Sequence, residues 1–190
     1  MDDVPRRWRC AGRIGGPTMT GEFLLGLLLA AGAATAQPLP DKPVAEARRP
    51  SNPEALAFVA EKDAHADLER ALSEAKQNDK TVLVIMGANW CHDSIGLAGW
   101  LDTPRFSDMM RDRYNIVYID VGTPQIGKGR NLDIARHFGI NKVKNTPLVL
   151  VISADGERLN SKKDAIGWRN AASRSEDEIY RYFATFKTNG

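Results

Sequence analysis

Two segments of the buried-strand type, the continuous apolar run 81–86 and the largely apolar residues 115–121, constrain the fold of this chain more than any other feature. Both are rich in β-branched residues and lack alternating polar positions. Such strands have no face that water can reach, so each must be covered on both sides. Between them we expect a helix over residues 91–101 and a second helix that begins at Thr103-Pro104. Strands joined in this way form a parallel pair.

Further helices and a hairpin complete the expected order. A cap at residues 51–54 predicts a first helix with one apolar side. That side consists of Leu56, Val59, Ala60, Ala64, Leu68, Leu72 and Ala75. Residues 132–138 indicate another helix, and residues 148–152 a strand that turns into a shorter polar strand near 157–160. A capping box at 175–178 opens the last helix. This order predicts an α/β protein, a three-layer α/β/α sandwich with a central mixed sheet.

The first 36 residues have the order of a secretory signal. Arginines precede an apolar run over residues 23–34, and the small residues 34–36 follow it. The run is too short to span a bilayer comfortably, so we expect a cleaved signal peptide over residues 1–36 and no permanent membrane anchor. An uncleaved anchor is the alternative, and Met19 is an alternative start. Export, to the periplasm or by secretion, follows from this interpretation.

The remaining chain has the composition of one globular domain. Residues 37–52 are rich in proline and in charged residues, which indicates an extended linker. Residues 53–190 then form the domain. Hydrophobic residues make up 43% and charged residues 26% of the sequence, a balance typical of soluble globular chains. The formal net charge is only +2, and several arginines lie in the leader, so we expect no nucleic-acid partner.

Cysteine usage singles out one thiol. The chain has two cysteines, Cys10 and Cys91, and cleavage of the leader would remove Cys10. Exported proteins tend to pair their thiols, so one remaining cysteine points to a chemical role. The alternative is a small buried side chain, a common fate of free cysteine. We expect Cys91 at the first turn of a helix, where the dipole and unpaired N–H groups stabilise a thiolate.

The order of elements, with Trp90-Cys91 after the first strand and Thr146-Pro147 before the hairpin, resembles the thioredoxin superfamily over about residues 53–187. The resemblance implies a thioredoxin-like fold. It also implies a cis peptide bond before Pro147, with the proline loop beside Cys91. Trp90, Thr146 and Pro147 would then contact the substrate.

Two positions depart from the family pattern. Ser94 replaces the second cysteine of the motif, and Ile85 stands where many members carry a buried acid. The chain therefore has a monothiol Cys-His-Asp-Ser motif. Such a motif cannot form the internal disulfide of a dithiol reductant.

A single reactive thiolate can still attack a disulfide and form a mixed disulfide, which an outside thiol must release. We therefore predict thiol–disulfide exchange or isomerisation, with Cys91 as nucleophile and with His92 and Ser94 as further catalytic residues. A protonated His92 would add positive charge near the sulfur, and Ser94 would donate a hydrogen bond to it. The expected partners are client protein thiols or disulfides and an external thiol reductant.

We expect neither a cofactor nor a metal ion. His92 adjoins Cys91, but adjacent residues at a helix start point apart, and no second cysteine or well-spaced histidine accompanies them. The rival hypothesis is a noncatalytic binding module or chaperone-like protein for an exported partner. In that case Cys91 would be incidental.

Overall fold

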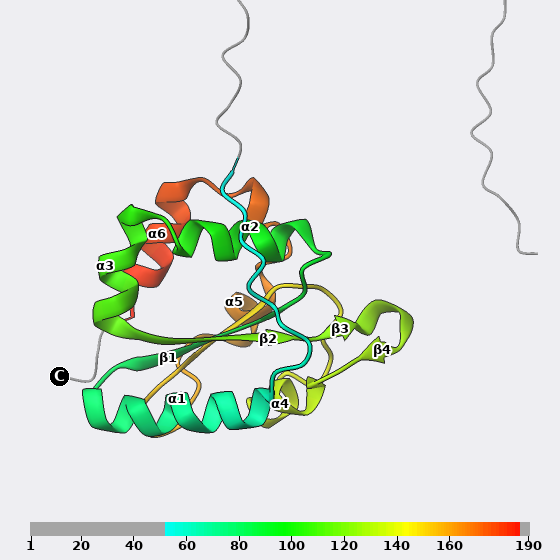
Figure 1. Cartoon of the computed structure of the whole chain (residues 1–190), viewed down its shortest axis with the longest axis horizontal. Coiled ribbons are helices and arrows are strands. Elements are labelled where there is room, and N and C mark those ends of the chain that lie inside the picture. Colours follow the sequence, from blue (N-terminus) through cyan, green and yellow to red (C-terminus); the bar gives the residue numbers. More distant parts are fainter. Residues whose placement is uncertain (1–51, 187–190) are drawn as a thin grey trace, which may run out of the picture. The chain divides into compact units, whose positions relative to one another are not determined.

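The computed structural model describes residues 52–186. At its centre is a sheet with the strand order β2-β1-β5 (Figure 1). Strand β1 (Thr81–Gly87) pairs in parallel with β2 (Tyr114–Asp120) and antiparallel with β5 (Leu148–Ile152). The expected mixed sheet is therefore confirmed. The proposed signal peptide, residues 37–51 of the linker, and Cys10 lie outside the described residues.

Every residue of β1 is buried, because the strand has a neighbour on each edge and a hydrophobic core on each face. Val82, Val84 and Met86 point into one core, and Leu83 and Ile85 into the other. Successive side chains of a strand point to opposite faces. Two buried faces explain why the segment lacks polar positions.

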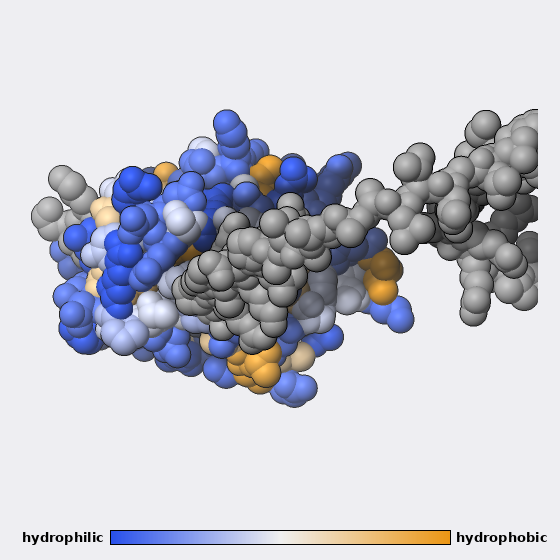
Figure 2. Space-filling model, turned by 90° about the horizontal axis from the view of Figure 1, so that it is seen from above, coloured by the Kyte–Doolittle hydropathy of each residue, from blue (hydrophilic) through white to orange (hydrophobic). Residues whose placement is uncertain are grey.

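Helices form the two outer layers (Figure 1). Helices α1 (Ala64–Asn78) and α4 (Leu132–His137) cover one face. The other face is covered by α2 (His92–Leu101), α3 (Pro104–Arg113) and α6 (Glu176–Ala184). The three-layer α/β/α sandwich is thus confirmed. On the side seen in Figure 2, hydrophilic residues dominate, and the hydrophobic ones form small separate patches.

The first helix begins later than the sequence predicts. It starts at Ala64, and its cap is Asp63, whose carboxylate accepts hydrogen bonds from the backbone N–H groups of two following residues. The predicted cap at residues 51–54 opens no helix, and Leu56 and Val59 of the predicted apolar side are 73% and 42% exposed. An aspartate cap at the later position satisfies the helix terminus.

The segment before α1, residues 52–62, is here called the strap. Asn89 binds its backbone twice: the N–H of Phe58 donates to Asn89 Oδ1 at 3.1 Å, and Asn89 Nδ2 donates to the Phe58 carbonyl at 2.8 Å. The N–H of Ala55 donates to the carbonyl of Ile95 in α2 at 3.0 Å. These bonds join distant parts of the chain, so helical periodicity could not reveal them.

The predicted second strand of the hairpin does not form. Only a single bridge joins Ile152 to Arg158. Beyond it, the buried side chain of Asn160 takes the place of a backbone partner for β5. Its Oδ1 accepts from the N–H of Val151 at 3.1 Å, and its Nδ2 donates to the carbonyl of Val149 at 2.9 Å. One amide side chain therefore ends the sheet where a strand was expected.

Shorter elements complete the fold. The loop after β2 contains a small antiparallel pair, β3 (Gly122–Thr123) and β4 (Lys128–Gly129), around a 3-10 turn, η1 (Pro124–Ile126). After β5 come a short helix, α5 (Lys162–Ile166), which the sequence did not predict, and a 3-10 turn, η2 (Ala171–Ser173). The capping box of α6 is confirmed. None of the helices in residues 52–186 is both long and apolar enough to cross a membrane.

Two glycines of α2 give a matched test of the strap. A Cβ atom at Gly99 would collide with the backbone of Pro53, whereas a Cβ atom at Gly96 would lie 3.6 Å from Ala172, an ordinary contact. We expect Gly99→Ala to lower the free energy of unfolding by about 1–3 kcal/mol through overpacking. Gly96→Ala should raise it by up to about 1 kcal/mol, because alanine favours helix. Equal effects in urea denaturation would contradict this packing.

Candidate active site

Cys91 is the residue that caps the N-terminus of α2. Its side chain is partly exposed, and its thiol donates a hydrogen bond to the backbone carbonyl of Thr146, with 3.4 Å between Sγ and O. Helix α2 is 10 residues long, so its aligned peptide dipoles place partial positive charge beside the sulfur. The sulfur therefore lies between a helix N-terminus and a backbone carbonyl.

The sheet brings Cys91 and Thr146 together across 55 residues of sequence. Strand β1 ends shortly before Cys91, and β5 begins shortly after Thr146. Because β1 and β5 are antiparallel, with Met86 opposite Leu148, the end of one lies beside the start of the other. The strand pairing therefore positions the thiol against the loop.

The Thr146–Pro147 peptide bond is cis, as the resemblance implies. Both residues are buried, and the Thr146 hydroxyl has no hydrogen-bond partner among the described residues. Only the Thr146 carbonyl reaches toward the cysteine. The loop thus presents backbone rather than side-chain polar atoms to whatever approaches the sulfur.

Trp90 stands at the rim of the site. Its side chain is 54% exposed, and its indole Nε1 donates to the carbonyl of Gly122 at 3.0 Å. Gly122 belongs to β3, so the small β3-β4 pair anchors the ring. No local pattern in the sequence connects this glycine-rich loop to the tryptophan. A ring fixed at its nitrogen and exposed on its face is suited to contact a bound chain.

His92 is directed to the strap. Its Nδ1 lies 3.0 Å from Oε1 of Glu54, and both side chains are largely exposed. The next residue, Asp93, accepts a hydrogen bond from the N–H of Ala172 at 2.9 Å and so ties α2 to η2. Sequence reasoning missed Glu54 and Ala172, because no local pattern signals contacts made across the fold. His92 and Asp93 therefore each have a partner that holds the start of α2 in place.

Ser94 differs from its predicted role. The residue is fully buried, and its hydroxyl has no hydrogen-bond partner among residues 52–186, so the predicted bond to the Cys91 sulfur is absent. A Cβ atom added to Gly87 would lie 2.6 Å from Ser94 Oγ and 2.8 Å from the Phe58 ring. The hydroxyl and the ring of the strap thus share one small space at the end of β1. Ile85, in the same strand, is buried in the apolar core.

The described residues contain no group of three or more histidine, cysteine, aspartate or glutamate side chains that could hold a metal ion. The pair formed by His65 Nε2 and Asp133 Oδ2, 2.9 Å apart, joins α1 to α4 and lacks a third ligand.

Comparisons with known proteins identify similar chains. A family model described as thioredoxin-like matches residues 63–154. The crystal structure of disulphide isomerase from Xylella fastidiosa Temecula1 is 30% identical, with a TM-score of 0.62 over 69% of this chain and 96% of that chain. The oxidised C-terminal domain of DsbD from Neisseria meningitidis is 22% identical, with a TM-score of 0.38 over 58% and 96%. A comparison with curated proteins finds no match.

Two buried serines test whether the Ser94 hydroxyl has a bonding role. Ser94 Oγ has no hydrogen-bond partner among the described residues, whereas Ser153 Oγ accepts from the N–H of Glu157 at 3.1 Å. We expect Ser94→Ala to raise the free energy of unfolding by about 1 kcal/mol, because it removes an unsatisfied buried group, and Ser153→Ala to lower it by about 1 kcal/mol. Denaturant unfolding measures both. A loss of stability in Ser94→Ala would show that the hydroxyl is bonded after all.

Proposed function

The chain belongs to the thioredoxin superfamily, and we propose that it acts in thiol–disulfide exchange or isomerisation with Cys91 as its single nucleophile. The observation that carries the proposal is the position of the Cys91 sulfur, at the N-terminus of α2 and 3.4 Å from the Thr146 carbonyl. The 30% identity to a disulphide isomerase, with 96% of that chain covered, supports the same activity.

The first step is attack on a client disulfide. The Cys91 thiolate forms a bond to one sulfur of the client, the client S–S bond breaks, and the second client sulfur leaves as a thiolate that takes up a proton from water. The helix terminus places partial positive charge beside the attacking sulfur. We assign contact with the bound client to the exposed ring of Trp90 and to the backbone of the Thr146–Pro147 loop, whose carbonyl lies 3.4 Å from the sulfur.

Release of the client needs a sulfur that this motif does not contain. Position 94 carries a buried serine, so no second thiol of the motif can attack the mixed disulfide. In isomerisation, another thiolate of the same client attacks the client sulfur, a new client disulfide forms, and the Cys91 thiolate leaves with no net change in oxidation state. Alternatively, an external thiol reductant attacks and frees both chains.

We assign His92 and Glu54 the role of positioning the strap against the first turn of α2. Their contact joins the first turn of α2 to the strap, at a distance of 3.0 Å. Because the pair is exposed, its contribution to stability is small. Its effect is to fix the strap next to the cysteine.

We also propose that the protein acts outside the cytoplasm. The support is the sequence of the leader, whose basic region, short apolar run and small residues before position 37 form the pattern of a cleaved signal. Oxidising compartments are where wrongly paired disulfides arise, so an isomerase has substrates there.

Replacement of Cys91 tests the proposed function. In a redox buffer that supplies a small thiol, we expect the wild-type protein to speed the recovery of activity of a ribonuclease with scrambled disulfides. Cys91→Ala should reduce this rate to that of the buffer alone, because no mixed disulfide can form. Ser153→Ala serves as a control for handling and folding. Equal rates for wild type and Cys91→Ala would instead favour a noncatalytic binding module.

A further inference from the structure

A basic groove lies next to the loop that contacts the cysteine. It has a volume of about 460 Å³. Four of the residues that line it are cationic and exposed: Lys142, Lys144, Lys163 and Arg169. No acidic residue lines the groove. Within residues 52–186, none of the four cations forms an ion pair with an aspartate or a glutamate.

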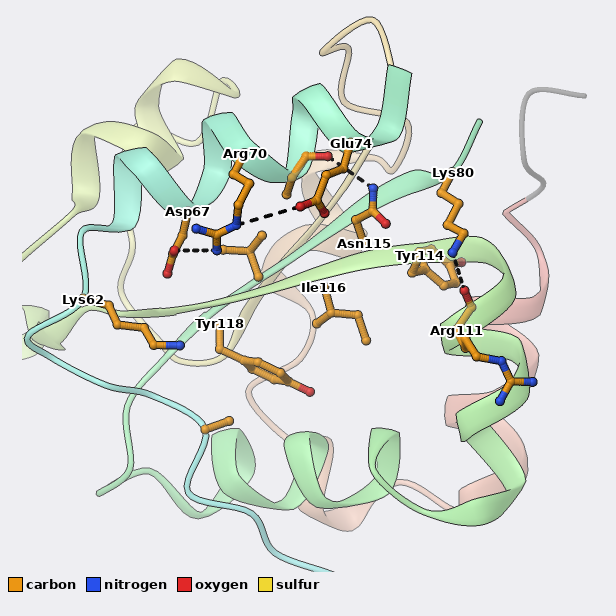
Figure 3. Close-up of a pocket in the computed structure, with 13 residues that line it drawn as sticks. Lys62, Asp67, Arg70, Glu74, Lys80, Arg111, Tyr114, Asn115, Ile116 and Tyr118 are labelled. Atoms are coloured by element: carbon orange, nitrogen blue, oxygen red, sulfur yellow. Dashed lines mark hydrogen bonds and ion pairs between the residues drawn. The ribbon is translucent and has the colours of Figure 1, made fainter. Parts of the chain in front are cut away.

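A second groove, along the outer edge of β2, shows by contrast how cations are neutralised elsewhere (Figure 3). There Arg70 lies between Asp67, at 2.7 Å, and Glu74, at 3.9 Å. Arg111, at the other end, is 2.7 Å from Asp108. Both arginines of that groove are therefore paired with carboxylates on the same surface. The four cations of the basic groove have no such carboxylate partners within residues 52–186, so their charge is available to a ligand.

The floor of the basic groove is apolar. Val143 and Leu148 line it together with Ile166, whose side chain is 51% exposed. A ligand that fits such a surface carries carboxylates above the cations and at least one apolar side chain toward the floor. A polypeptide segment with alternating acidic and apolar residues has both features in extended form, because its side chains point to alternate sides.

The residues that line the groove include neighbours in sequence of the loop at the proposed active site. Lys144 and Asn145 line it, and the next residue in the chain is Thr146, whose carbonyl lies 3.4 Å from the Cys91 sulfur. A client joined to Cys91 through its own cysteine, and extended along the loop, would therefore reach the cations within a short distance.

From these observations we infer that the basic groove selects client polypeptides in which an acidic, partly apolar segment flanks the reacting cysteine. The inference rests on the proposed function, since it names the substrate class of the same site. The commitment to a polypeptide follows from the spread of the cations over the loop before Thr146 and over α5 with the residues after it. Opposite charge raises the rate of association most at low salt, where screening is weakest.

Three cysteine peptides of equal length provide the test. In each, the cysteine is joined by a disulfide to an uncharged small thiol, and leucine alternates with glutamate, glutamine or lysine on both sides. Mass spectrometry follows the formation of the peptide adduct at Cys91. We expect the acidic peptide to react about tenfold faster than the neutral one and the basic peptide to react slowest, with the difference shrinking as salt is added.

Paired charge variants locate the effect. Lys144→Gln combined with Lys163→Gln removes two charges from the groove, and we expect it to abolish most of the preference for the acidic peptide. Lys62→Gln combined with Lys76→Gln removes two exposed charges elsewhere and should retain the preference. An equal loss in both double variants would overturn the inference, because net charge would then explain the preference.

The remaining outcomes separate the two proposals. If all three peptides form adducts at the same rate, the groove has no selective role, and the proposed function stands. If none of them forms an adduct while Cys91 is still alkylated by iodoacetamide, thiol–disulfide exchange itself is contradicted, and the inference falls with it.

Discussion

The pairing of β1 with its two neighbours is the constraint on which the rest of the structure depends. The strand is buried along its whole length, parallel to β2 on one edge and antiparallel to β5 on the other. The first pairing requires a crossover, which α2 and α3 provide, and so places a helix N-terminus directly after the strand. The second brings the start of β5, and with it the Thr146 carbonyl, against the cysteine that begins that helix.

The strap adds further contacts around Cys91 and the start of α2. Phe58 is buried beside Gly87 and Ser94, Asn89 holds its backbone, and Glu54 contacts His92. Together they hold the first turn of α2 and enclose the side chain of Ser94, three residues after the cysteine.

Much of the fold could be predicted from the sequence, because its determinants are local. Apolar runs identified β1, β2 and β5, and the Thr103-Pro104 and Ser175 to Glu178 patterns identified two helix starts. Three of the errors involve polar side chains whose bonding is set by the fold and not by the local sequence. Asn89 keeps the strap extended, Asn160 replaces the last strand, and Ser94 makes no bond to the cysteine. No spacing within the sequence encodes these contacts. The family resemblance supplied the proximity of Thr146 and Cys91, which periodicity alone would not.

We propose that Cys91 captures a client sulfur and cannot release it alone. The intact mass of the reduced protein, after it has reacted with a peptide disulfide and the excess peptide has been removed, tests this directly. We expect one peptide bound at Cys91, stable until a small thiol is added, whereas a Ser94→Cys variant, with a second thiol three residues away, should release the peptide unaided. A wild-type protein that never gains the peptide, or that loses it without added thiol, would show that Cys91 does not act in this way.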